Sequence, residues 1–297
     1  MRNAFAEALY EAAKADDRIR VVVADISPAG SMEKFQAEYP DRFINVGVAE
    51  QAMIGIAAGM ALKGLRPFCY TIATFALYRP FEFIRNDLCY QNLPVIVVGM
   101  GAGVIYSTLG STHHAQEDVA IASAIPNMQV LAPCDPAECR EAVKYAALQS
   151  KGCLYLRIGK AGEPDLTQKA DPFQFGCLRY LQTGIDVCIV AYGPIMKMAR
   201  QIAERLETQL GKSVSVASCH TLKPLDRMGL QEVLQRHPWV IVLEEHSPHG
   251  GLAAQVKAIA WDIKAKCELE VFTLKDEFIH CYRSHSDLLA AHGLKLQ

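Results

Sequence analysis

The sequence predicts an α/β fold with two domains, each a mostly parallel β-sheet flanked by helices. Short apolar runs rich in β-branched residues alternate with segments of helical periodicity along most of the chain, and this pattern is typical of a parallel sheet covered on both faces. The alternation lapses between residues 160 and 180, where glycine and proline gather, and then resumes. A chain of 297 residues that is 51% hydrophobic and 21% charged can form two buried cores.

In the first half, strands and helices are expected to follow one another in turn. Phe5, Leu9 and Ala12 recur at helical spacing near the N-terminus, and Gly64 ends a later helix that begins at residue 51. The expected strands span residues 20–26, 43–48, 66–72, 94–100, 129–132 and 154–158. The expected helices span residues 3–15, 33–39, 51–62, 75–91, 115–124 and 136–148.

The second half repeats this plan on a smaller scale. Strands are expected at residues 186–191, 213–218, 240–243 and 269–273, and helices at 195–210, 226–235, 252–264 and 286–292. We therefore divide the chain into a first domain (1–165), a linker (166–180) and a second domain (181–297).

Composition excludes several classes of function. The net charge of −2 and the lack of a basic stripe argue against nucleic-acid binding. No apolar run approaches the ~20 residues of a membrane span, and the N-terminus has no apolar signal-peptide region. The ten cysteines are scattered without zinc-type spacing, which favours reduced thiols in a cytoplasmic protein.

The segment from Phe43 to Gln51 is the first candidate for chemistry. It is predicted as a short buried strand that ends in the carboxylate of Glu50 and opens into a helix of small residues, with no cation nearby in the sequence. Strand ends that open into helices are where α/β proteins place their active sites. The alternative is that Glu50 only caps the first turn of the helix.

Several motifs resemble one enzyme family when taken in order. They are Val46-Gly47-Val48-Ala49-Glu50-Gln51, Ala73-Thr74-Phe75, Gly110-Ser111-Thr112-His113-His114, Ile125-Pro126-Asn127-Met128, and Glu244-Glu245-His246 with Gly250-Gly251-Leu252. The first half resembles the pyrimidine-binding domain of transketolase and of deoxyxylulose-phosphate synthase, and the second half resembles the C-terminal domain of the same enzymes. The resemblance implies thiamine diphosphate, bound at a subunit interface, as cofactor.

The resemblance also implies roles for residues of the cofactor site. Glu50 would hydrogen-bond N1′ of the aminopyrimidine, where a carboxylate is suited to exchange a proton. Phe75 would stack on the pyrimidine, and Tyr78 would be a further cofactor contact. From the residues alone, Phe75 is better explained as a core aromatic of helix 75–91, and Tyr78 fits either account.

Three further residues are candidates for substrate contacts. His113 matches a family histidine that works near the substrate hydroxyls as a proton relay, and the adjacent His114 could serve instead. Arg157 matches an arginine placed on the substrate phosphate, for which a guanidinium fork is well suited. The alternatives are solvated loop histidines and a surface arginine paired with an acid. Glu244-Glu245-His246 is expected to be a solvated charged loop, and we assign it no catalytic role.

The chain also departs from the family pattern. Gly101-Ala102-Gly103 stands where transketolase has a further histidine, and Leu109 stands where the family has an aspartate. Both missing groups read sugar hydroxyls in the family, so a modified or specialised sugar, or a different donor, is expected.

No Gly-Asp-Gly segment is present to hold a metal and a diphosphate. We therefore expect an N-terminal transketolase subunit to carry the diphosphate and Mg²⁺ site, in a dimer of heterodimers. The small-residue helix around Gly55 and Gly59 permits close packing at a subunit interface or within the chain.

The leading hypothesis is the C-terminal subunit of a split transketolase, which transfers a two-carbon ketol unit from a ketose (phosphate) to an aldose. One alternative is the beta subunit of a 2-oxo-acid dehydrogenase, which shares the two-domain plan. Another is a non-catalytic regulatory homologue, which the loss of polar groups at Gly101 and Leu109 would fit and the retention of Glu50 and Phe75 would not.

Overall fold

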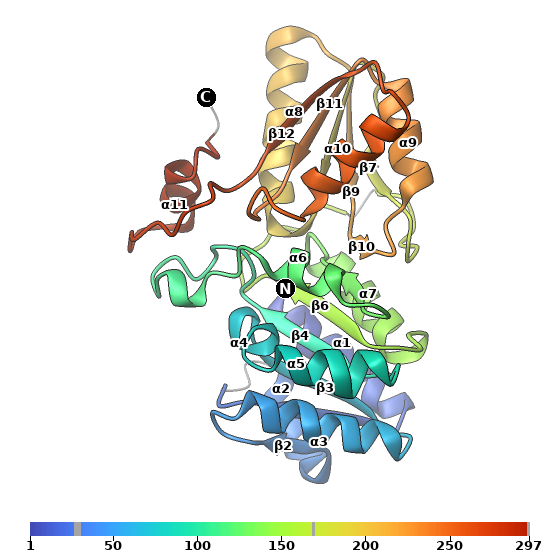
Figure 1. Cartoon of the computed structure of the whole chain (residues 1–297), viewed down its shortest axis with the longest axis vertical. Coiled ribbons are helices and arrows are strands. Elements are labelled where there is room, and N and C mark those ends of the chain that lie inside the picture. Colours follow the sequence, from blue (N-terminus) through green and yellow to red (C-terminus); the bar gives the residue numbers. More distant parts are fainter. Residues whose placement is uncertain (27–30, 168–169, 296–297) are drawn as a thin grey trace.

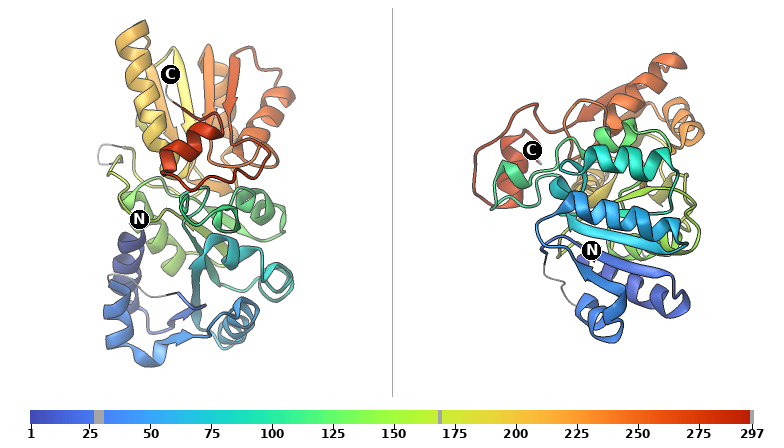
Figure 2. Two further views of the ribbon diagram at one scale, coloured as in Figure 1. Left: turned by 90° about the vertical axis from the view of Figure 1, so that its left-hand side faces the viewer. Right: turned by 60° about the horizontal axis from the view of Figure 1, so that its bottom comes forward.

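The computed structural model describes residues 1–26, 31–167 and 170–295. Two β-sheets lie one above the other along the long axis of the molecule, each flanked by helices (Figure 1). A turned view shows the same two layers, with the last helix, residues 285–291, near the junction between them (Figure 2). This arrangement confirms the predicted α/β fold.

The first sheet has seven strands in the order β10-β5-β6-β4-β3-β1-β2. Its parallel strands are β1 (Ile19–Val23), β2 (Phe43–Asn45), β3 (Arg66–Ile72), β4 (Ile96–Met100), β5 (Gln129–Leu131) and β6 (Leu154–Ile158). Strand β10 (Thr221–Lys223) comes from the second half of the chain and pairs antiparallel with β5. The second half therefore completes one edge of the first sheet.

Alternating side chains place apolar residues on both faces of the first sheet. Helices α1 (Arg2–Ala15) and α7 (Pro136–Leu148) cover one face, where Phe5 packs with Val21 and Val98. Helix α3 (Glu50–Leu62) covers the other face, where Met53 packs with Val22 and Val97. Short helices α2 (Ser31–Glu38) and α6 (Asp118–Ala124) complete this half. No helix in the described part of the chain is both long and apolar enough to cross a membrane.

The segment 73–91 differs from the single helix that the sequence predicts. It consists of α4 (Ala73–Leu77), the short α5 (Phe81–Phe83) and a π-helix, η2 (Ile84–Tyr90). Pro80 lies between α4 and α5 and has no N–H to continue the helical hydrogen bonds. As a result, Phe75 lies in a one-turn helix directly after β3.

Strand β2 is shorter and more exposed than predicted. It ends at Asn45 instead of residue 48, its residues are half-buried or exposed, and Val48 is 70% exposed. The reason is its place at the edge of the sheet, with β1 as its one neighbour.

The second sheet has five strands in the order β12-β11-β8-β9-β7. They are β7 (Arg179–Gln182), β8 (Val187–Ala191), β9 (Val214–Ser218), β11 (Trp239–Leu243) and β12 (Glu268–Phe272). All neighbours are parallel except β7, which runs antiparallel to β9. The sequence analysis missed β7 and β10, which have only four and three residues.

The helices of the second half are α8 (Met196–Leu210), α9 (Arg227–Arg236), α10 (Leu252–Asp262) and α11 (His285–Ala291). Helix α8 ends at Gly211, whose φ of +61° is a left-handed C-cap that favours glycine. Helix α11 stands apart from the other three, beside the loop that follows β4 (Figures 1 and 2).

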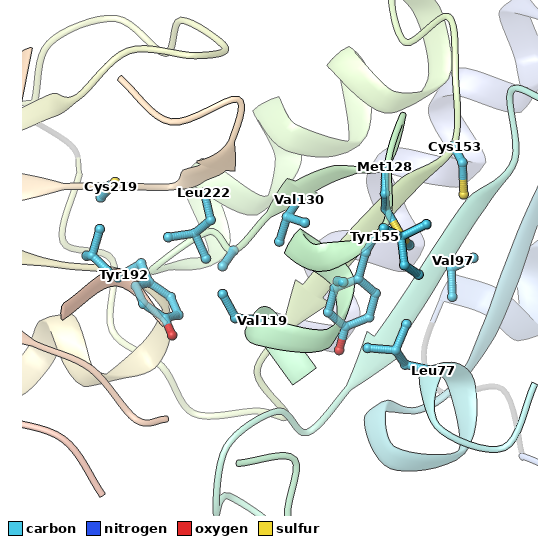
Figure 3. Packing of buried hydrophobic residues seen from close by; sticks show 14 of the residues in the cluster. Leu77, Val97, Val119, Met128, Val130, Cys153, Tyr155, Tyr192, Cys219 and Leu222 are labelled. Carbon is cyan, nitrogen blue, oxygen red and sulfur yellow. The ribbon is translucent and has the colours of Figure 1, made fainter. Parts of the chain in front are cut away.

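The hydrophobic core is continuous between the two sheets. Val119 and Val130 of the first sheet's layer lie between Tyr155 on one side and Tyr192 and Leu222 on the other (Figure 3). The two halves are therefore packed against each other through buried side chains.

The predicted linker is attached to the first half. The Oδ2 of Asp135 accepts hydrogen bonds from the backbone amides of Leu166 and Thr167 and from the Thr167 hydroxyl, at 2.7 to 2.8 Å. Its Oδ1 accepts from the amide of Glu138 at 2.7 Å and so caps α7. Residues 168–169 of the linker lie outside the described residues.

We predict that Asp135→Ala destabilises the protein by about 2–4 kcal/mol, because it removes a helix cap and leaves buried amides without an acceptor. Urea unfolding measures this change. Ser284→Ala is the matched control: it removes the exposed cap of α11 and is expected to cost about 1 kcal/mol or less. Equal losses in the two variants would contradict the role assigned to Asp135.

Candidate active site

Glu50 begins α3 and its side chain is buried, with 2% of the residue exposed. The turn before it contains Gly47, whose φ of +69° favours glycine. The Oε2 of Glu50 pairs with Nη1 of Arg79 at 2.7 Å, and the Arg79 side chain is 40% exposed. The sequence shows no cation next to Glu50, but the fold supplies one from the segment between α4 and α5.

Phe75 and His113 lie next in the same series of contacts. The guanidinium carbon of Arg79 is 4.7 Å from the centre of the Phe75 ring. The rings of Phe75 and His113 are 5.2 Å apart between centroids and meet edge to face at 73°. Arg79 therefore contacts both Glu50 and Phe75, and Phe75 in turn contacts His113. These contacts bring three of the predicted site residues together.

His113 belongs to a loop of residues 101–115 that leaves the sheet after β4. A hydrogen bond from the amide of Ala115 to the carbonyl of Gly103, at 2.8 Å, closes the neck of this loop. The Thr112 hydroxyl lies 3.0 Å from Nδ1 of His113. Burial lowers the pKa of His113 below its ordinary value, so a neutral imidazole able to accept a proton prevails at neutral pH.

His114 is buried, with 2% exposed, and neither of its ring nitrogens has a hydrogen-bond partner. Burial lowers its pKa as well. Since His113 is the more exposed of the two and faces Phe75, the geometry favours His113 as the histidine that reaches a ligand.

Tyr78 is half-buried and its hydroxyl is already engaged. It donates to Oε2 of Glu117 at 2.9 Å and accepts from the amide of Glu117 at 3.3 Å. Burial raises the pKa of Tyr78, and the neighbouring carboxylates Asp118 and Glu117 raise it further. A cofactor contact of Tyr78 would therefore use the ring and leave the hydroxyl in place.

Arg157 is buried and paired inside the protein. Its Nε donates to Oδ2 of Asp118 at 2.9 Å, and its Nη2 donates to the backbone carbonyl of Glu245 at 2.9 Å. The Tyr155 hydroxyl donates to the same oxygen of Asp118 at 2.8 Å. These contacts connect Arg157 to both halves of the chain, and its contact with a substrate phosphate stays a prediction.

The interpretation of Glu244-Glu245-His246 as a solvated loop is wrong. All three residues are buried, with 0 to 1% exposed. The carboxylate of Glu244 accepts from the amides of Leu252 and Ala253 at 2.9 Å, at the start of α10. His246 accepts from the amide of Ala120 at 3.2 Å.

Three residues to which the sequence assigns no functional role, Arg79, Asp118 and Glu245, contact the candidate site residues or the loop that carries His113. Arg79 follows Phe75 and Tyr78 in the sequence. An arginine close to aromatic residues is only a weak indication that the cation contacts a ring. Glu245 makes its contacts with Val104, Arg157 and His285, which lie 141, 88 and 40 positions away, so no local pattern could identify them.

Gly99 in β4 and Gly101 directly after β4 do not form an open anion cradle. A Cβ on Gly99 would lie 2.5 Å from the Tyr155 hydroxyl, and a Cβ on Gly101 would collide with the ring of Tyr106. Aromatic side chains therefore fill the space along this glycine run. Among the described residues, no group of three or more His, Cys, Asp or Glu side chains is arranged to hold a metal ion.

Comparison with known proteins shows the family to which the chain belongs. Residues 1–162 match the family described as transketolase, pyrimidine binding domain, and residues 176–296 match transketolase, C-terminal domain. The chain belongs to the transketolase family. This confirms the resemblance that the motifs predict.

Relatives within the transketolase family cover nearly the whole chain. An apulose-4-phosphate transketolase subunit of Phocaeicola vulgatus is 33% identical over 294 residues, which cover 99% of this chain and 93% of the relative. The 6-deoxy-6-sulfo-D-fructose transketolase subunit SqwH of Clostridium sp. is 35% identical, covering 86% of this chain and 78% of the relative.

A solved structure has the same fold. The protein described as "Split gene transketolase, inactive beta4 tetramer" is 35% identical and superposes with a TM-score of 0.86, covering 99% of this chain and 93% of that chain. The chain thus corresponds to the C-terminal subunit of a split transketolase.

We predict that Arg157→Met destabilises this transketolase chain by about 3–5 kcal/mol, because it leaves the buried carboxylate of Asp118 without its cation. Thermal or urea unfolding tests this. Arg140→Met, which breaks an exposed pair with Glu7, is the control and is expected to cost at most about 0.5 kcal/mol. Near-wild-type stability of Arg157→Met would contradict the stabilising role of its pair with Asp118.

The pair formed by the buried Glu245 and the half-buried His285 predicts a pH dependence of stability. Burial alone would lower the pKa of His285, but the Glu245 carboxylate at 2.9 Å outweighs it and raises that pKa above 6.5. Conversely, burial alone would raise the pKa of Glu245, but His285 and Arg157 lower it below 4.5. The pair therefore stabilises fully between pH 4.5 and 6.5, and the stabilisation is lost as pH rises through the raised pKa of His285.

The measurement is the difference in unfolding free energy between wild type and His285→Gln. We expect this difference to be larger near about pH 6 than near about pH 9. A difference that stays constant or grows toward alkaline pH would contradict the assignment.

Proposed function

We propose that this chain, together with an N-terminal transketolase subunit, forms a thiamine-diphosphate-dependent enzyme that transfers a two-carbon ketol unit from a ketose (phosphate) to an aldose. The observation that carries the proposal is the series Glu50–Arg79–Phe75–His113, which gathers a buried carboxylate, an aromatic ring and a neutral histidine at one place. These are the groups that a pyrimidine and a sugar require.

The residues fit the pyrimidine half of the cofactor. In the structure a planar, delocalised cation, the Arg79 guanidinium, contacts the Glu50 carboxylate and lies over the face of Phe75. A protonated aminopyrimidine is also planar, cationic and rich in N–H donors, so it suits the same two partners. In this proposal a ring stacked on this face of Phe75 takes the place of the guanidinium, whose side chain is 40% exposed and moves toward solvent.

The diphosphate and Mg²⁺ belong, in this proposal, to the partner subunit. The filled glycine run after β4 supports this, because Tyr106 and Tyr155 occupy the space that an anion would need. The solved relative, described as an inactive tetramer of beta chains, is consistent with activity that needs a second kind of subunit.

Helix α3 supplies a surface for the assembly. Its side that faces away from the sheet exposes Ala52, Ile56, Gly59 and Leu62, and a helix that is apolar on all sides is normally covered. The glycines leave open space for close approach of another helix. We propose that α3 lies at a contact between subunits in a dimer of heterodimers.

Each residue of this chain then has a defined task. Bound thiamine diphosphate supplies a nucleophilic carbon and an electron sink. Glu50 holds and exchanges the proton at N1′ of the ring. Phe75 fixes the plane of the ring, and His113, oriented by the Thr112 hydroxyl at Nδ1, accepts or donates a proton at a substrate hydroxyl through Nε2.

The substrate is, in this proposal, a modified sugar. Leu109 is 46% exposed on the loop that carries His113, and it stands where a polar group would read a hydroxyl. A site without that group tolerates a sugar that lacks or replaces the hydroxyl. The relatives act, by their names, on apulose-4-phosphate and on a 6-deoxy-6-sulfo sugar.

The domain division at residues 165 and 181, the cytoplasmic location and the reduced state of the thiols are part of the same proposal. Strand β6 ends at Ile158 and β7 begins at Arg179. All ten cysteines, each in the described part of the chain, are free.

We predict that Glu50→Gln in the reconstituted complex lowers the rate of ketol transfer by about 100-fold or more, because the amide cannot exchange a proton at N1′. Turnover of ketose phosphates with an aldehyde acceptor measures this. Glu33→Gln, at an exposed carboxylate in the first turn of α2, is the matched control and keeps wild-type activity. Unchanged turnover in Glu50→Gln would contradict the enzyme function.

A further inference from the structure

The position of His113 depends on a loop with little structure of its own. Within residues 101–115, the chain forms a single short 3-10 turn, Ser111–His113, and the bridge between Gly103 and Ala115. Such a loop needs outside contacts to hold a side chain in one place. The first half supplies some of these contacts: the amides of Gly101 and Ala102 donate to the carbonyl of Ile158 at 3.0 and 3.3 Å, and Nζ of Lys160 lies 5.0 Å from the centre of the Tyr106 ring. The second half supplies further contacts at the neck and along the outer part of the loop.

Glu245 makes the most direct of these contacts. It follows β11, is 1% exposed, and its Oε1 accepts a hydrogen bond from the amide of Val104 at 2.6 Å. A Cβ at Gly103 would lie 2.5 Å from the same oxygen, and the φ of Gly103 is +65°. The neck of the loop therefore admits the carboxylate only because residue 103 is glycine.

The same oxygen of Glu245 connects the loop to the C-terminal segment. His285, the first residue of α11, lies with its Nε2 2.9 Å from Oε1 of Glu245. The backbone carbonyl of Glu245 accepts a further hydrogen bond, from Nη2 of Arg157 at 2.9 Å. Glu245 is thus held from both sheets, and an ionised carboxylate with these donors forms stronger hydrogen bonds than a neutral group.

Residues 274–285 lie along the outer part of the loop, between β12 and α11 (Figures 1 and 2). The Ser111 hydroxyl donates to the carbonyl of Ile279 at 3.5 Å. The ring of Tyr282 lies against Gly110, where a Cβ would come within 3.0 Å of it. These contacts reach the residues directly before His113, while Glu245 holds the neck.

We propose that Glu245 is a positioning residue for ketol transfer, which holds the loop 101–115 through the Val104 amide and the His285 imidazole and so fixes His113 beside Phe75. This inference rests on the proposed function. It also gives the second domain a role in the reaction: the domain fixes the substrate side of the site, whereas Glu50 and Phe75 on the cofactor side are placed by the first domain alone.

The expected effect follows from the geometry. Loss of the anchor lets His113 move relative to the substrate, and displacement of a catalytic group by about 1 Å costs about 100-fold in rate. The cofactor contacts of Glu50 and Phe75 do not involve Glu245, so cofactor affinity stays the same. A residue that only stabilised the fold would instead reduce cofactor binding and activity together.

The experiment compares Glu245→Gln, Glu245→Ala and His285→Ala in the complex with the partner subunit. Glutamine keeps an acceptor for the Val104 amide but loses the charge, so it should be affected less than alanine. His285→Ala, at the solvent side of the pair, leaves the buried carboxylate and the fold in place. His249→Ala is the control, because it removes an exposed histidine–carboxylate pair with Asp276 in the same domain.

Four quantities are measured: kcat and KM for the sugar, the Kd of thiamine diphosphate with Mg²⁺ by calorimetry, and hydrogen exchange of the amides of residues 103–114. We expect kcat/KM to fall by about 10- to 100-fold in Glu245→Ala, with a smaller fall in the two milder variants. Exchange should accelerate in the loop and not in β4 or β6, while the cofactor Kd and the control stay at wild-type values.

The results that would contradict the positioning role differ from those that would contradict the proposed function. Wild-type kcat/KM in the variants, or a parallel loss of cofactor affinity and activity, overturns the positioning role of Glu245. Absence of ketol transfer by the wild-type complex overturns the proposed function itself, and it is recognised before any variant is compared.

Discussion

The buried ion pair of Arg157 and Asp118 is the interaction on which the arrangement of the two halves depends. Arg157 lies on β6 of the first sheet, pairs with Asp118 at the start of α6, and donates to the carbonyl of Glu245 after β11. Removal of two charges from water is costly unless both are well paired and hydrogen-bonded. The Tyr155 hydroxyl supplies a further donor to Asp118, so the pair is satisfied, and it holds the strand ends of both sheets at one junction.

That junction explains where the candidate site lies. Parallel strands place their carboxyl ends on the same edge, and the loops after those ends carry the functional residues. Glu50 follows β2, Phe75 follows β3 and His113 follows β4. The second half contacts this edge through Glu245, which accepts from the amide of Val104, and through His246, which accepts from the amide of Ala120.

Much of the fold could be predicted from the sequence because its elements are long and regular. Residues 66–72, 136–148 and 154–158 have the predicted bounds. The strands β7 and β10 could not be predicted, because they are too short to show an alternating hydrophobic pattern. They form only because they pair with strands that are distant in the sequence. Segment 75–91 has helical periodicity, but Pro80 divides it.

The candidate site could also be predicted only in part from the sequence. Glu50, Phe75 and His113 are carried by local motifs, whereas the pairing of Glu50 with Arg79 and the burial of His114, Arg157 and Glu245 arise only from contacts between distant parts of the chain.

The central claim is that this chain supplies one half of a cofactor site that two subunits share. Calorimetric titration of thiamine diphosphate with Mg²⁺ into this chain alone, and into its mixture with the N-terminal subunit, tests that claim most directly. The account predicts tight binding to the mixture and none to the chain alone; tight binding to the isolated chain, or no binding to the mixture, would contradict it.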